Sequence, residues 1–202
     1  MKLVNQNQFQ KSLKEFSKIE DARDQLWGRA QILIKKGFEI EAYILILATW
    51  NFARFRYFMK NFDLEEFGRV INKTKPVFNK LKKLKFEKVN LNDINLRKDI
   101  KIIYKELKKI AEQTGATKIM ALKNPKLFIM WDTEIRRIYK IPNKATSTDY
   151  LEFLCKMKNI FGHIKWRNKN MPIAKAIDEY NYVKVDKIRK LRKDRLKISK
   201  KI

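Results

Sequence analysis

The chain has 202 residues, and its 48 Lys and Arg outnumber its 22 Asp and Glu, so the net charge is +26. Hydrophobic residues make up 45% of the chain, which is enough for a buried core and excludes wholesale disorder. Because so large an excess of positive charge favours a polyanionic partner, nucleic acid is the first class of partner to consider.

Several other classes are excluded at the same stage. The longest apolar stretch, 42–50, is half the length of about 18 residues that a membrane span needs, so we expect no membrane partner. The amino-terminal residues lack the apolar stretch of a secretory signal, and we expect a cytoplasmic monomer. Cys155 and His163 are the single cysteine and histidine, too few for a disulfide or a thiolate–imidazole zinc site. We therefore expect no metal. Since the chain has no Walker-type or Rossmann-type glycine loop, we expect no cofactor either.

Five Gly and four Pro leave long uninterrupted periodic segments, which predicts an all-α fold. A helix is expected from Asp21 to Lys36, with Gly37 as its stop. The next apolar segment, 39–50, suits a buried helix, although residues 43–47 alone would also suit a buried strand. Further helices are expected to begin at Asp63, at Thr74 with Pro76, at Asn95 (to about Gln113), at Asp132 (to Tyr139), at Ser147 or Thr148, and at Pro172 (to Tyr182).

A break is expected within the third quarter of the chain. Thr114 and Gly115 should end the helix that starts at Asn95, and a short apolar segment, 116–122, should restart at once and stop at Asn124-Pro125.

The expected architecture is two helical lobes flanking a cleft. Residues 1–183 form one two-lobed domain, in which the middle lobe covers about 38–125 and the other lobe combines 1–37 with 126–183. Residues 184–202 form a basic C-terminal helix or tail with a net charge of +8. The tail either contacts nucleic acid or docks on the body as an amphipathic helix.

Two further segments are candidates for nucleic-acid contact. Lys73 to Lys88 holds seven lysines against Glu87 and is either a binding surface or a solvated helix face. The segment from Trp50 to Phe58 interleaves aromatic residues with Arg54 and Arg56, a pattern in which rings stack on bases while arginines bind phosphates. Its phenylalanines also have the spacing of core residues.

Other residues with reactive side chains point to structural roles. Cys155 lies on the apolar face of its predicted helix, so we expect a small core residue. Asp178 and Tyr182 share a helix face, where a buried hydrogen-bond network is expected rather than acid–base catalysis.

One longer pattern carries a resemblance. A helix is followed by a glycine turn at Thr114-Gly115, a second helix and a short connection. The next helix then begins at Asp132-Thr133-Glu134-Ile135-Arg136. This order resembles the helix-hairpin-helix DNA glycosylases of the endonuclease III superfamily. The earlier stretch 46–51, Ile-Leu-Ala-Thr-Trp-Asn, is similar to a second motif of that family. The resemblance covers about residues 40 to 140.

The resemblance implies a site. Backbone amides at Thr114 and Gly115 would hold a DNA phosphate, and Asp132 would assist cleavage of the glycosidic bond. Trp50 and Asn51 would enter the space that an extruded base leaves. The Schiff-base lysine of lyase-active members aligns with Gly115, so Lys118, three residues later, is the candidate nucleophile or a phosphate contact.

The prediction is therefore a DNA-binding protein, with base excision by a glycosylase as the specific hypothesis and duplex DNA favoured over RNA. Besides the residues already named, the expected DNA contacts are Arg54, Arg56, Lys123 and Arg136. The alternatives are a non-catalytic DNA- or RNA-binding module, in which Asp132 is only a helix cap, and an RNA-associated protein with a basic tail. An Asp132 that faces a cleft near Lys118 or Trp50 would favour the enzyme.

Overall fold

The computed structural model describes residues 3–19, 22–50, 55–56 and 59–199. Every regular element within these ranges is a helix, which confirms the all-α prediction. The segment that also suited a strand is helical throughout. The elements in chain order are α1 (Gln6–Ile19), α2 (Ala22–Lys35), α3 (Glu39–Trp50), the short 3₁₀ helix η1 (Met59–Asn61), α5 (Leu64–Leu81), α6 (Ile94–Lys123), α7 (Thr133–Ile138), α8 (Ser147–Phe161) and α9 (Ile173–Ser199).

Two predicted helix starts are wrong. The helices expected at Asp63 and at Thr74 are one helix, α5, which carries Pro76 in its interior. The carbonyl that Pro76 leaves without a donor is that of Asn72, and Asn72 is exposed, so water can satisfy it. The N-cap of α6 is Asp93 rather than Asn95, and its carboxylate accepts a hydrogen bond from the amide of Leu96 at 2.8 Å.

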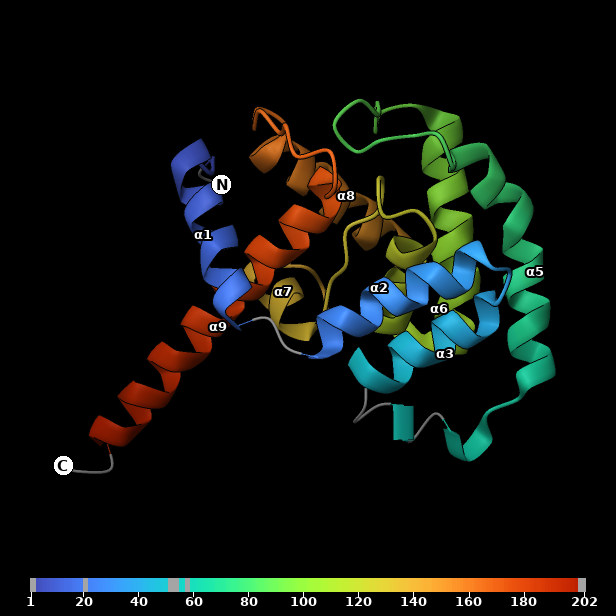
Figure 1. Ribbon diagram of the computed structural model, residues 1–202, viewed down its shortest axis with the longest axis horizontal. Coiled ribbons are helices and arrows are strands. Elements are labelled where there is room, and N and C mark those ends of the chain that lie inside the picture. Colours follow the sequence, from blue (N-terminus) through green and yellow to red (C-terminus); the bar gives the residue numbers. More distant parts are fainter. Residues whose placement is uncertain (1–2, 20–21, 51–54, 57–58, 200–202) are drawn as a thin grey trace.

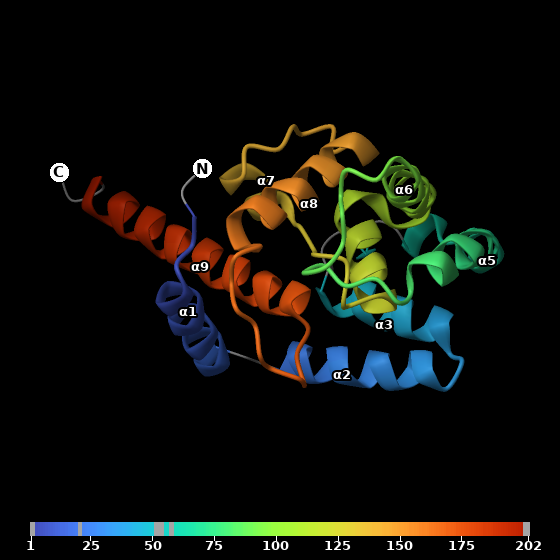
Figure 2. The same ribbon diagram turned by 90° about the horizontal axis from the view of Figure 1, so that it is seen from above.

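The helices pack in neighbouring pairs: α2 along α3, α5 along α6, α6 against α8, and α1 against α9 (Figures 1 and 2). α2 also contacts α6, so it packs with the middle elements of the chain, whereas α1 packs with the last helix. One contiguous hydrophobic core joins residues from all of these helices. The division into a middle lobe, 38–125, and a second lobe stays a prediction.

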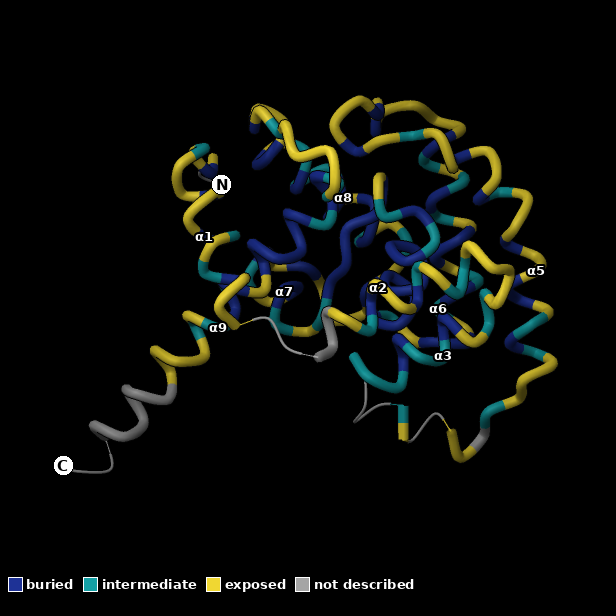
Figure 3. The backbone as a smooth tube through the Cα atoms, viewed as in Figure 1, coloured by how far each residue is buried: buried dark blue, intermediate teal, exposed yellow. Residues whose placement is uncertain are grey.

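α9 continues without a break across residue 183, where we placed the start of the basic tail. Its first half is buried against the body up to Val185, and Leu191 and Arg192 are exposed (Figure 3). In Figure 1 the end of α9 projects away from the other helices. In the described part of the chain, no helix has the length and apolar character needed to cross a membrane.

Candidate active site

A cleft of about 380 Å³ opens where α1 and α3 end and where α6, α7 and α9 meet. Four residues predicted for the site line it together: Trp50, Thr114, Lys118 and Asp132. The sequence separates the first and last of them by 82 positions. The cleft also has walls that the sequence analysis did not assign to the site, among them Phe16 on α1 and Lys175, Asp178 and Glu179 on α9.

A kink in α6 comes just before the cleft-lining residues Thr114 and Lys118. Glu112 has φ 54° and ψ −172°, which divides α6 into two straight helices, 94–111 and 113–123. The expected break at Thr114-Gly115 is therefore wrong by two residues, because Gly115 lies within the second helix and is buried. Tertiary packing accounts for this position: the indole Nε1 of Trp131 donates to the carbonyl of Gln113 at 3.0 Å, directly after the kink.

Trp131 is the anchor of the segment that leads into α7. It is fully buried and contacts the rings of Tyr104, Tyr150 and Phe153 at centroid distances of 5.8, 5.0 and 5.4 Å. Its amide donates to the hydroxyl of Thr117 at 3.3 Å. Because Thr117 and Trp131 are joined in this way, the residues that follow them, Lys118 and Asp132, both reach the cleft.

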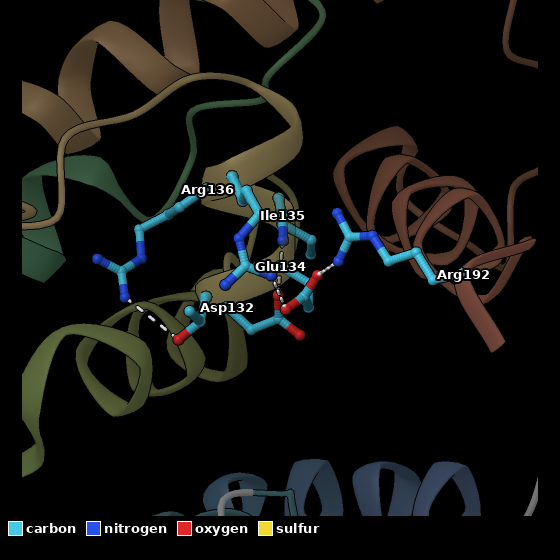
Figure 4. A network of polar contacts seen from close by, with 7 residues as sticks. Asp132, Glu134, Ile135, Arg136 and Arg192 are labelled. Atoms are coloured by element: carbon cyan, nitrogen blue, oxygen red, sulfur yellow. Dashed lines mark hydrogen bonds and ion pairs between the residues drawn. The ribbon is translucent and has the colours of Figure 1, made fainter. Parts of the chain in front are cut away.

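Asp132 is half-buried and caps α7. Its Oδ1 accepts a hydrogen bond from the amide of Ile135 at 2.7 Å, as an N-cap carboxylate does (Figure 4). The neighbouring Glu134 forms ion pairs with Arg137 and, at 3.2 Å, with Arg192 of α9 (Figure 4). These contacts tie α7 to the last helix and hold the Asp132 carboxylate in place at the edge of the cleft.

Lys118 is only 7% exposed, and its ammonium donates to the carbonyl of Trp50 at the end of α3. The last carbonyls of a helix have no partner within the helix and carry its negative dipole end.

Trp50 forms one wall of the cleft together with a stack of aromatic rings. Its ring lies on that of Trp27, with centroids 5.2 Å apart and an angle of 25°. The ammonium of Lys175 lies 5.5, 5.7 and 5.5 Å from the rings of Phe16, Trp27 and Trp50, and 3.4 Å from a carboxylate oxygen of Glu179. Trp50 is half-buried in this stack, so insertion into a duplex would require it to leave Trp27.

Asp178 is a buried carboxyl group on the cleft wall. Its Oδ1 accepts a hydrogen bond from the amide of Met130 at 2.7 Å, which agrees with the expected structural role. Burial raises its pKa well above the usual range, an effect that the charge of Lys175 opposes. The expected partner Tyr182 is 40% exposed and packs edge-on against Phe16.

The remaining predicted DNA contacts are placed unevenly. Asn51 and Arg54 lie outside the described residues, and Arg56 is exposed. Lys123 forms an ion pair with Glu39, at the opposite end of α3 from Trp50, and does not line the cleft.

Arg136 is buried rather than exposed. Its guanidinium lies 5.8 Å from the Trp131 ring and donates to the carbonyl of Asn143 at 3.2 Å and to the hydroxyl of Thr133 at 3.4 Å. Arg136 and Lys123 hold the fold together, so we remove both from the expected DNA interface.

Within the described residues, no group of three or more His, Cys, Asp and Glu is arranged to hold a metal ion. Comparison of the chain with family models, with curated proteins and with solved structures found no match. The resemblance to DNA glycosylases therefore rests on the sequence motifs between residues 40 and 140.

Proposed function

We propose that this protein binds duplex DNA and excises a damaged or mismatched base, as a divergent helix-hairpin-helix glycosylase. The observation that supports this most is that Asp132 lines one cleft with Lys118 and Trp50. The cleft volume of about 380 Å³ is within the range of small-molecule sites and leaves room for one extruded base.

In the proposed reaction, the glycosidic bond breaks and the base departs with the bonding electron pair. The ionised carboxylate of Asp132 stabilises the positive charge that develops on the sugar. A water molecule then bonds to the sugar C1′, and its proton is taken up by Asp132 or by solvent. The cap to Ile135 uses one carboxylate oxygen, and the second oxygen is available to this charge.

Lys118 supplies the lyase branch of the same proposal. Its amine would attack the sugar C1′ in place of water, after losing a proton and its bond to the Trp50 carbonyl. A Schiff base to the opened sugar then permits strand cleavage. The bound state must therefore change the contact between Lys118 and the end of α3.

The alternative is a non-catalytic nucleic-acid module, and one specific observation favours it. Asp132 makes the N-cap hydrogen bond that a purely structural residue would make. Both proposals expect salt-dependent DNA affinity, because the positive charge of the chain releases counterions from phosphates. They differ in whether the negative charge of Asp132 is needed for a reaction in addition to the N-cap hydrogen bond.

The test is base release from a panel of duplexes that each carry one lesion or mismatch. Asp132→Asn keeps an oxygen for the cap, so we expect nearly unchanged melting temperature and DNA affinity, with excision reduced by orders of magnitude. Asp93→Asn is the matched control, because Asp93 caps α6 in the same way and does not line the cleft. If Asp132→Asn excises bases as well as the natural chain does, or if the natural chain excises no base from any duplex, the non-catalytic module is the remaining proposal.

The basic end of α9 has its own test. Val185 is buried, so truncation should follow Arg192 rather than Val183, which removes five Lys and Arg and one Asp. We expect weaker binding to duplex of any sequence and a smaller dependence of affinity on salt. An unchanged salt dependence would mean that residues 193–202 make no phosphate contact.

A further inference from the structure

A second hollow lies along the amino-terminal part of α1, between that helix and the loop 162–171 that joins α8 to α9. It has a volume of about 540 Å³, and its lining includes Gln6 and Lys14 of α1 and Lys165, Trp166 and Arg167 of the loop. We call it the α1 groove. None of these cations was assigned to a site by the sequence analysis.

The α1 groove is held in shape by its own hydrogen bonds. The side-chain amide of Gln6 donates to the carbonyl of Lys165 at 3.3 Å and accepts from its amide at 3.1 Å. The indole Nε1 of Trp166 donates to the carbonyl of Met171 at 2.7 Å. The Asn168 Oδ1 accepts from the amides of Asn170 and Met171 at 2.8 and 3.2 Å. The loop is thereby fixed against α1 at several points.

Charge in the α1 groove has one sign. None of its eight lining residues, all within the described part of the chain, is acidic. Lys14, Lys165 and Arg167 are exposed, while Trp166 is half-buried and packs edge-on against Phe9 at 5.7 Å. Cations, side-chain amides and one aromatic ring suit a sugar–phosphate backbone, because phosphate contacts position a nucleic acid without reading its bases.

α1 connects the groove to the cleft. Gln6 and Lys14 line the groove, and Phe16 and Ile19, at the carboxyl end of the same helix, line the cleft. In Figure 1, α1 runs from its amino end near loop 162–171 to a crossing with α9. On α1 the groove-lining residues run from Gln6 to Lys14 and the cleft-lining residues are Phe16 and Ile19, so the two sets are between 2 and 13 residues apart. At roughly 1.5 Å per residue this is about 3 to 20 Å along the helix, or about one to six nucleotides of a strand that carries a phosphate per roughly 3.4 Å of axis.

We propose that the α1 groove binds the DNA backbone on one side of the base held in the cleft, within about six nucleotides of it. This inference rests on the proposed function, since it assigns the cleft to the extruded nucleotide. It adds a binding site that contributes affinity and register and takes no part in the chemistry.

The first experiment measures duplex affinity as a function of salt. The groove variant combines Lys14→Gln, Lys165→Gln and Arg167→Gln. The control combines Lys36→Gln, Lys98→Gln and Lys105→Gln, which are exposed residues lining neither hollow. Each lost phosphate contact lowers the log–log slope by about 0.9, so we expect a fall of about 2 to 3 for the groove variant and less than about 1 for the control. Equal slopes for the two variants would overturn the groove.

The second experiment locates the contact. Duplexes with one lesion carry uncharged methylphosphonate linkages over about the first six nucleotides on one side of the lesion or on the other. We expect the natural chain to lose affinity for only one of the two placements, and the groove variant to lose little for either. Equal losses on both sides would overturn the proposed register.

Failure of the groove and failure of the glycosylase give different results. If the natural chain excises a base but the groove variant and the control variant have equal salt slopes, the groove proposal is overturned and the glycosylase proposal stands. If the groove variant has the lowered salt slope but the natural chain excises no lesion, the groove remains a backbone-binding site and the glycosylase proposal is overturned. If the natural chain shows no salt-dependent affinity for duplex DNA, both proposals are overturned.

Discussion

The two hollows that α1 helps to line differ in the charges of their side chains. The cleft combines Lys118 and Lys175 with Asp132, Asp178 and Glu179, and its groups are held by hydrogen bonds and rings of the protein itself. The α1 groove presents only cations and neutral polar groups apart from its apolar and aromatic side chains.

This difference separates chemistry from binding. A reaction that passes through a cationic sugar needs a carboxylate where water is partly excluded, and only the cleft offers one. A phosphate backbone needs exposed cations, which the groove supplies. Substitutions in the cleft should therefore change reaction rates at constant salt dependence, and substitutions in the groove should do the reverse.

The largest effect is expected from Lys118→Gln. Without an amine, no Schiff base forms, so strand cleavage at the lesion and the adduct trapped by borohydride should both disappear. Because Lys118 is 7% exposed and points into the cleft, the salt dependence of duplex binding should stay as in the natural chain.

Lys156→Gln is the control for that variant. The Lys156 ammonium also donates to a backbone carbonyl, that of Tyr139 at 3.1 Å, but does not line the cleft. The Lys156→Gln variant should still form the adduct that borohydride traps. An adduct that persists in Lys118→Gln would assign the nucleophile to another amine.

A smaller effect concerns the pH dependence of stability through Asp178. Its pKa is raised by burial, so the folded chain keeps a proton that the unfolded chain releases near pH 4. The free energy of unfolding should therefore fall as the pH rises from about 4 toward the folded pKa. Asp178→Asn should remove this fall, which urea unfolding between pH 4 and pH 8 measures.

Asp178→Ala separates the charge from the hydrogen bond. It leaves the buried Met130 amide without an acceptor, which should cost about 1–3 kcal/mol at every pH. If Asp178→Asn has the pH profile of the natural chain, the fall comes from another group.

The smallest effect is expected at the kink in α6, two residues before Thr114. Glu112 has a positive φ with ψ near 180°, a combination that glycine adopts far more readily than other residues. Glu112→Gly should be more stable than Glu112→Ala by about 1 kcal/mol. Comparing these two variants cancels the loss of the carboxylate side chain, and urea unfolding gives the difference. Equal stability would show that the backbone relaxes.

Part of the candidate site was predictable because some of its residues belong to local sequence motifs. Asp132 has the sequence of an N-cap, and the segment around Lys118 follows a break, so both could be named before any fold was known. Lys175 and Glu179 have the i, i+4 spacing of an ion pair on one helix, but no local signal connects that pair to Trp50.

Side-chain type alone misassigned two cations. Lys123 and Arg136 were expected to contact phosphate because they are basic and close to the motifs. Lys123 instead forms an ion pair with Glu39, which is distant from it in sequence. Arg136 donates to the carbonyl of Asn143, seven residues later in the chain. Charge in a sequence does not report burial, because long basic side chains can pack along the interior.

The sequence by itself determined the helical class, the strong positive charge and the cap at Asp132, because these depend on residue type, periodicity and immediate neighbours. Only the tertiary structure decided where α6 bends, since the contact between Trp131 and the Gln113 carbonyl joins segments 18 residues apart. It also decided that α1 lines both a cleft of mixed charge and a groove of positive charge, because the walls of each come from segments far apart in the sequence that meet only when the core packs.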